Sequence, residues 1–263
     1  MASLETDVAF SLDLLLFQVF GESAFFYNDG APKNEGAFYV AGERQNGGLV
    51  TPLISAFGED FAYEGGGPNG DVAVGGEIAN LQFGAFVGPQ YEFGFEVTGL
   101  ELSAAEFADV VISETLKDDK ALIAKVFSGD DEFTGSSKRD VLDGLAGKDT
   151  LEGGGGNDVF RLSQKAGGAN ADEILDFKVG KDVIELSKVA FAKVKFDGKG
   201  DLAKGSFVVG EEAGDLNDRI IYDDETGDLF YDKNGSERGG QKLIATLDDH
   251  LDLTRADFDL FIP

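Results

Sequence analysis

A nine-residue period between residues 128 and 160 constrains this chain more than any other feature. The pattern, most complete in the third and fourth copies, places glycines two and five positions before an aspartate and a large apolar residue two positions after it. The aspartates are Asp131, Asp140, Asp149 and Asp158, the apolar residues Phe133, Leu142, Leu151 and Phe160, and the glycines Gly129, Gly135, Gly144, Gly147, Gly153 and Gly156. In the second copy Ser137-Lys138-Arg139 replaces a glycine pair. Three residue classes that share one period argue against an ordinary glycine-rich loop with surface acids.

This repeat predicts a coil that depends on a metal ion. A glycine-rich turn followed by a short strand makes half of a coil, so Asp131 stacks over Asp149 and Asp140 over Asp158. Carboxylates that close repel strongly at low dielectric. A hard divalent ion held by carboxylate and carbonyl oxygens removes the repulsion, and oxygen-only ligands favour calcium. We therefore predict calcium ligands in the four aspartates and in the backbone of Gly129, Gly147 and Gly156.

The repeat region resembles the RTX nonapeptide family, which forms a calcium-filled parallel β-roll. With two copies on each side, we expect about one full ion site per side. The segment that begins at Asp172 and ends at Phe177 resembles the segment that caps such rolls. The resemblance implies that Asp172 completes the last ion site, with Asp176 as the second candidate.

The chain is long enough for two domains, which we place at residues 1–125 and 126–263. We predict a mainly β protein with an α+β N-terminal domain and a C-terminal parallel β-roll that carries a β-cap. The first domain is expected to contain helices near 11–20, 103–113 and 118–127 and strands at 37–40, 72–78 and 91–97. Strands at 182–186, 219–222, 229–232 and 242–247 are expected to form the cap, with a hairpin turn at 224–227.

Charge and composition exclude several classes of partner. The formal charge of −28 argues against binding nucleic acid or an anionic membrane surface. The chain has no cysteine, so disulfides cannot stabilise it outside the cell. Metal ions can take that role, because their binding energy contributes to folding.

The two ends of the chain predict the export route. The apolar stretch from Phe10 to Phe20 is interrupted by Asp13 and Gln18, too short to span a bilayer and without the basic leader of a general signal peptide. The acidic and apolar C-terminus, residues 257–263, resembles the uncleaved signal of type I secretion substrates. We therefore expect a secreted protein, extracellular or associated with the cell surface, whose partners include the type I machinery. The same residues also suit a last β-strand that closes the domain.

A second resemblance lies in the N-terminal domain. It rests on Phe20-Gly21, on the 61–63 segment Phe-Ala-Tyr, on the 74–84 segment that holds Gly75-Gly76, and on residues 97–103. These motifs resemble the secreted haem-acquisition hemophores, an α+β family in which a tyrosine ligates the haem iron beside a histidine. The resemblance places Tyr63 at the iron ligand and Asp71 at the histidine. The single histidine of the chain, His250, falls in the cap, where we expect it at the surface near a turn.

Catalytic motifs are missing from the sequence: there is no cysteine, no H-E-x-x-H and no G-x-S-x-G near His250. We therefore expect a binding protein rather than an enzyme. The main expectation is a secreted calcium-binding RTX protein, folded by extracellular calcium, with an N-terminal module that binds an unknown ligand or cell-surface partner. The alternatives are a calcium-dependent adhesion or biofilm-matrix protein, a hemophore-type haem binder and an extracellular polysaccharide-active enzyme.

Overall fold

The computed structural model describes residues 3–6, 25–28, 36–41, 51–67, 70–87, 90–107 and 116–263, and the side chains of 77–81, 97–107 and 120–263. The helix expected near 11–20 lies outside the described residues. The described elements group into two units, one that ends with the helix α2 (Leu116–Val126) and one that runs from Phe127 to Pro263.

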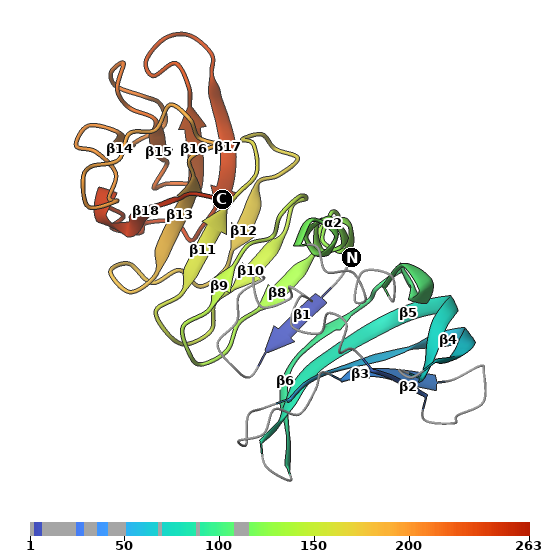
Figure 1. Ribbon diagram of the computed structural model, residues 1–263. Helices are drawn as coiled ribbons and strands as arrows, with labels where there is room; N and C mark the ends of the chain where they lie inside the picture. The colour runs from blue at the N-terminus through green and yellow to red at the C-terminus, as the bar shows by residue number, and fades with distance from the viewer. Residues whose placement is uncertain are drawn as a thin grey trace. The chain divides into compact units, whose positions relative to one another are not determined.

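The first unit is built on an antiparallel sheet in the order β1-β6-β5-β4-β3-β2. Its strands are β1 (Ser3–Thr6), β2 (Phe25–Asn28), β3 (Gly36–Ala41), β4 (Thr51–Gly67), β5 (Gly70–Val87), β6 (Gln90–Thr98) and β7 (Leu102–Ser103), which pairs with β5 (Figure 1). The three predicted strands fall inside β3, β5 and β6. Residues 104–107 begin the helix expected near 103–113, and α2 matches the one expected near 118–127.

The repeats of the second unit fold as two stacks of short parallel strands. On one side, β8 (Glu132–Thr134) and β10 (Thr150–Glu152) pair so that Phe133 lies opposite Leu151. On the other side, β9 (Val141–Leu142) and β11 (Val159–Leu162) pair so that Leu142 lies opposite Phe160. These four apolar side chains are fully buried. The register confirms the predicted parallel roll, because copies of like orientation pair and the copies between them form the opposite sheet.

The roll continues beyond the repeats on both sides. Strand β12 (Asp172–Ile174) pairs in parallel with β10, and β13 (Val183–Ser187) pairs in parallel with β11. The C-terminal strand β18 (Phe258–Phe261) then pairs in parallel with β13 (Figure 1). The tail therefore has the structural role that we expected for it, since it closes the second sheet of the roll.

The cap is a sheet continuous with the first side of the roll, in the order β14-β15-β16-β17-β12. Its strands are β14 (Phe207–Val209), β15 (Ile220–Tyr222), β16 (Asp228–Asp232) and β17 (Gln241–Thr246). The predicted hairpin joins β15 and β16, and it turns where Gly227, at a φ of 79°, donates its amide to the carbonyl of Asp223. The strands predicted at 219–222, 229–232 and 242–247 are confirmed in the cap, whereas the strand predicted at 182–186 is β13 and belongs to the second sheet of the roll.

Candidate metal centre

The repeat aspartates form ladders in which the carboxylates of Asp149 and Asp158 accept hydrogen bonds from the backbone of the preceding coil. The amide of Asp131 donates to Oδ1 of Asp149 over 2.9 Å. The amide of Asp140 donates to Oδ1 of Asp158 over the same distance. The predicted stacking of these two pairs is therefore present, one pair on each side of the roll.

Each ladder extends by one aspartate from outside the repeats. The amide of Asp149 donates to Oδ1 of Asp172 at 3.2 Å, and the amide of Asp158 donates to Oδ1 of Asp182 at 2.9 Å. Asp172 therefore lies where the resemblance placed it, while Asp182 is a ladder residue that the spacing did not reveal. A local signal was present: Asp182 directly precedes Val183 of β13, just as Asp158 directly precedes Val159 of β11.

Burial makes these carboxylates costly to ionise in the absence of a cation. Desolvation is the largest cause that raises the pKa of Asp172 to about 8, with the charges of Asp149 and Asp143 adding to it. Desolvation likewise raises the pKa of Asp149 to about 7, with Asp131 contributing, and that of Asp158 to about 6. The ladder therefore concentrates negative charge that a bound cation would stabilise.

The second carboxylate oxygen divides the ladder residues into two kinds. Oδ2 of Asp140 accepts hydrogen bonds from the amide and hydroxyl of Ser136, at 2.8 and 2.9 Å. Oδ2 of Asp182 accepts one from the amide of Lys178, at 2.8 Å. We call these two carboxylates closed, because a protein group donates a hydrogen bond to Oδ2 of each.

Asp149 and Asp158 are open by the same criterion. Their side chains are 1% and 0% exposed, yet among the described residues no donor reaches Oδ2 of either. A buried carboxylate oxygen without a donor is unfavourable, and a bound cation would stabilise it.

Glycines leave room around the two open carboxylates. A Cβ added at Gly144 would lie 2.3 Å from Oδ2 of Asp149, and one at Gly153 would lie 2.8 Å from Oδ2 of Asp158. These two glycines therefore cannot carry a side chain while the carboxylates keep their positions.

Backbone carbonyls lie against the other glycine of each turn. Gly147 has a φ of 146°, and a Cβ there would lie 1.9 Å from the Gly129 carbonyl and 3.0 Å from Oδ1 of Asp149. At Gly156, with a φ of 147°, the corresponding groups are the Lys138 carbonyl at 2.3 Å and Oδ1 of Asp158 at 2.8 Å. On the second side of the roll, the carbonyl of Lys138 thus has the position that the carbonyl of Gly129 has on the first side.

The donor set around the open carboxylates suits a hard cation. Within the described residues, no group of three or more His, Cys, Asp or Glu side chains is arranged to hold a metal ion. An ion at Asp149 or Asp158 would therefore take its remaining ligands from backbone carbonyls and water. Carboxylate and carbonyl oxygens of this kind are the ligands of calcium rather than of zinc or copper, so the residues present fit the ion that the repeat predicts.

Asp176, the second candidate from the cap segment, lies outside the ladder. Its two oxygens accept the amides of Gly153 and Gly154, at 2.7 and 2.9 Å. The ammonium of Lys178 lies 3.0 Å from Oδ2 and also donates to the Gly154 carbonyl at 2.8 Å. Asp176 therefore holds the last glycine turn of the repeats in place.

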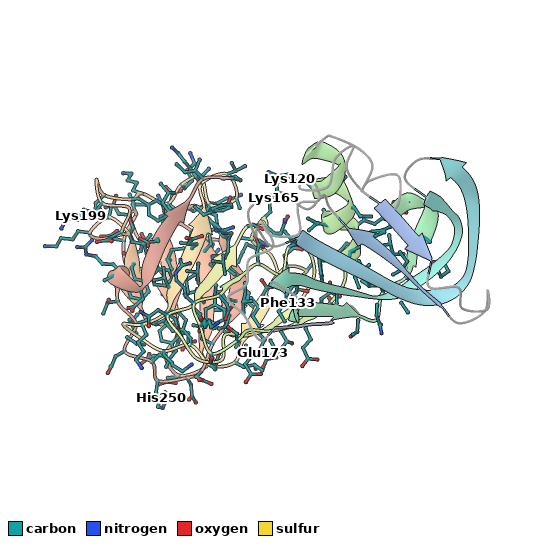
Figure 2. All side chains as sticks on the ribbon, turned by 60° about the horizontal axis from the view of Figure 1, so that its bottom comes forward. Lys120, Phe133, Lys165, Glu173, Lys199 and His250 are labelled. Carbon is teal, nitrogen blue, oxygen red and sulfur yellow. The ribbon has the colours of Figure 1, made fainter. Side chains whose placement is uncertain are left out.

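The remaining candidates lie away from the ladder. Tyr63 is in β4 opposite Ala73, and Asp71 pairs with Gly65 on the same hairpin, but both side chains lie outside the described ones. His250 is exposed in a surface turn, as predicted, and it projects from the second unit as Lys199 does (Figure 2). A hydrogen bond from its ring Nδ1 to the carbonyl of Asp224 is the main cause that raises the His250 pKa.

Comparison with known proteins supports this centre. Residues 127–160 match the family model of the RTX calcium-binding nonapeptide repeat, which spans four copies. A solved structure, the AlgE6R3 subunit of the mannuronan C5-epimerase from Azotobacter vinelandii, is 24% identical over 50% of this chain and 78% of that chain, with a TM-score of 0.32. That likeness is too distant to carry an argument about function. No curated protein matches the chain.

The chain thus carries RTX calcium-binding nonapeptide repeats at residues 127–160, and these repeats fold as a β-roll in its second unit, as predicted. These comparisons do not support the resemblance of the N-terminal domain to hemophores. Among the described helices, none has the length and apolar character that crossing a membrane requires.

Proposed function

We propose that this protein is a secreted binding protein whose second unit folds when calcium occupies the Asp149 and Asp158 sites. The observation that carries the proposal is that the buried Oδ2 oxygens of Asp149 and Asp158 have no hydrogen-bond donor among the described residues, within a calcium-binding repeat. The protein leaves the cell through a type I exporter, and its first unit binds a ligand or a surface. It acts by binding rather than by catalysis.

The two oxygens of each open carboxylate have different tasks. Oδ1 of Asp149 holds the amide of Asp131 and so fixes the distance between coils. Oδ2 is left for the ion, together with the Gly129 carbonyl beside Gly147; on the second side, Asp158 and the Lys138 carbonyl have the same roles. Bound calcium supplies the positive charge that the stacked carboxylates need in order to remain ionised while buried.

Calcium also explains why the chain would stay unfolded before export. With a net charge of −28, the chain repels itself when it carries no ion. Extracellular calcium modules bind at about 10⁻⁴–10⁻³ M, well above the free calcium of a cell interior. The second unit then folds only outside, where the ion is available.

The ligand assignment is tested by Asp→Asn substitutions and calcium titration calorimetry. Asparagine keeps an oxygen for the ladder hydrogen bond but places an amide where the ion would bind. We expect Asp149→Asn and Asp158→Asn each to remove one calcium-binding event. Asp140→Asn is the matched control, because Ser136 already satisfies Oδ2 of this buried ladder aspartate. Equal losses in all three variants would contradict the assignment to the open carboxylates.

The export route is tested by deleting the last ten residues in a cell that carries a type I exporter. This deletion removes the acidic and apolar tail, so the chain should stay inside. The deletion also removes β18, and Ile184→Ala serves as the control, because it removes a buried side chain of β13 opposite Phe258 of β18 but leaves the tail sequence unchanged. The control should be exported with an intact N-terminus apart from Met1. Cleavage after residues 15–30, seen by mass spectrometry, would indicate a general secretory route instead.

Two measurements distinguish the possible roles of the first unit: whether calcium makes the protein form oligomers, and whether the protein binds haem. An adhesion or matrix protein should form calcium-dependent oligomers in light scattering, while a small-ligand binder should remain monomeric. Haem binding should appear as a Soret band on titration. Both readouts use the full chain, since the second unit must be folded for the comparison.

A further inference from the structure

In four of the ladder aspartates, Asp140, Asp149, Asp158 and Asp182, the acceptor of one backbone amide distinguishes an open carboxylate from a closed one. At Asp140 and Asp182, the amide four residues earlier, from Ser136 and Lys178, donates to the aspartate's own Oδ2. The cap repeats this arrangement, since the amide of Gly214 donates to Oδ2 of Asp218. A closed carboxylate is therefore the ordinary result of this short turn.

At the two open carboxylates the same amide is taken by a different acceptor. The amide of Leu145, four residues before Asp149, donates to Oδ1 of Asp143 at 3.0 Å. The amide of Gly154, four residues before Asp158, donates to Oδ2 of Asp176 at 2.9 Å. In both turns the competing acceptor removes the donor that would otherwise close the site.

The backbone conformation agrees with this difference. Leu145 and Gly154 have φ values of 65° and 78°, in the left-handed region. Among the described non-glycine residues, only Leu145 and His250 have positive φ, so Ser136 and Lys178 do not share this conformation. A leucine in the left-handed region is strained, and such strain persists only where the surroundings enforce it.

Asp143 is placed to enforce it at the first site. It is buried, and its Oδ1 accepts both the Leu145 amide and the hydroxyl of Ser163, the latter at 2.8 Å. Ser163 directly follows β11, so it ties Asp143 to the core of the roll. At the second site, Asp176 is tied by its ion pair with Lys178.

We propose that Asp143 and Asp176 are positioning residues that hold the Leu145 and Gly154 amides away from Asp149 and Asp158 and so keep these carboxylates open for calcium. This inference rests on the proposed function. It explains why these four ladder aspartates differ in the hydrogen bonding of Oδ2 although they occupy equivalent places in the roll. It also assigns a task to Asp143, which has no place in the nonapeptide pattern.

The test compares Asp143→Ala with Asp143→Asn in the full chain by calcium titration calorimetry. Both variants lose the same charge, but asparagine keeps an Oδ1 acceptor for Leu145 and Ser163. Loss of a residue that orients a metal ligand typically lowers affinity about 10–100-fold. We expect such a loss at one site in Asp143→Ala and a change of less than about threefold in Asp143→Asn. Equal losses in the two variants would show a charge effect and overturn the proposal, and so would unchanged affinity in both.

Two further variants keep the test decisive. Ser163→Ala removes one partner of Asp143 and should lower the calcium affinity of the same site. This variant replaces Asp143→Ala in the test if Asp143→Ala does not fold. Unchanged calcium affinity in Ser163→Ala would then overturn the proposal. Asp223→Ala removes a similar turn hydrogen bond, from the Glu225 amide at 3.1 Å, in the cap, and should leave affinity unchanged. If Asp149→Asn keeps full calcium binding, the proposed function itself fails. If Asp149→Asn loses a site but the two Asp143 variants behave alike, only the positioning role fails.

Discussion

The amide of Asp158 donates to Oδ1 of Asp182 over 2.9 Å, although 24 residues separate the two and Asp182 lies outside the nonapeptide repeats. Asp182 is buried, and its Oδ2 accepts the Lys178 amide. The segment after the repeats therefore continues the coil with protein groups alone. The last aspartate of the ladder on the second side, Asp182, is therefore a closed carboxylate supplied by a segment that no longer follows the nine-residue repeat.

Replacing Asp182 should destabilise the second unit although it is not a repeat residue. Asp182→Ala leaves the amides of Asp158 and Lys178 without their acceptor, and a buried unsatisfied donor costs about 1–3 kcal/mol. We expect the free energy of unfolding to fall by about 2 kcal/mol or more in saturating calcium, measured by urea denaturation. Asp223→Ala, in the exposed hairpin turn, is the control and should change stability by less than about 0.5 kcal/mol. An unchanged midpoint for Asp182→Ala would show that the repeats alone stabilise the roll.

Two glycines that are equivalent in the repeat should respond differently to alanine. Gly147→Ala places a Cβ against the Gly129 carbonyl and forces an L residue into a φ of 146°. We expect a loss of about 3 kcal/mol or more, because both backbone strain and overpacking contribute. A Cβ at Gly129 meets no described heavy atom within 4 Å, so Gly129→Ala should be tolerated. Thermal unfolding in the presence of calcium measures the stability of both variants. Similar losses of stability in Gly147→Ala and Gly129→Ala would contradict the conformation described for this turn.

Without calcium, the second unit should be more stable in mild acid than at pH 8. The folded pKa values of Asp158, Asp149 and Asp172, about 6, 7 and 8, lie above the usual value of 3.8, so the folded state binds these protons more tightly than the unfolded one. Stability is therefore lost as the pH rises from about 4 to about 8. Calcium-stripped protein should melt at a higher temperature at pH 5.5 than at pH 8.

Calcium should reverse this dependence, because the ion competes with protons for the same oxygens. Calcium affinity is expected to rise between pH 5.5 and pH 8. The Asp149→Asn and Asp158→Asn double variant should show a flatter pH dependence in the stripped protein. A stripped wild-type protein that melts higher at pH 8 would contradict the raised pKa values.

Haem binding, if the N-terminal resemblance extends to function, should depend on Tyr63. With no histidine among residues 1–249, we expect weak binding or none. Haem is titrated into wild type and Tyr63→Phe, with Tyr91→Phe in β6 as the control tyrosine. A tight complex that survives Tyr63→Phe would place the site elsewhere, and the absence of a complex would favour a surface or protein partner.

The parts of the roll that follow the period could be predicted from the sequence. A step of nine residues that alternates between two sides leads directly to the pairing of Asp131 with Asp149 and of Phe133 with Leu151. Asp182 could not be found in this way, because the loop before it is longer and lacks the glycine spacing. The expectation of about one ion site per side counted only the four copies, whereas each ladder has a further aspartate.

The difference between open and closed carboxylates also lay beyond sequence reasoning. It depends on where one amide points, and at Gly154 the acceptor, Asp176, is 22 residues away. Leucine at position 145 gives no sign of a left-handed conformation, because this residue type rarely adopts it. Such contacts follow from the folded neighbourhood rather than from spacing.

The most direct test of the account is far-UV circular dichroism of the full chain during a calcium titration, with magnesium as the control ion. We predict that calcium-stripped protein at pH 8 lacks much of its β signal. Calcium up to the millimolar range should restore the signal in wild type and Asp140→Asn, but magnesium should not. The Asp149→Asn and Asp158→Asn double variant should show little calcium-dependent gain of β signal. A spectrum that is the same with chelator and with millimolar calcium would contradict calcium-dependent folding.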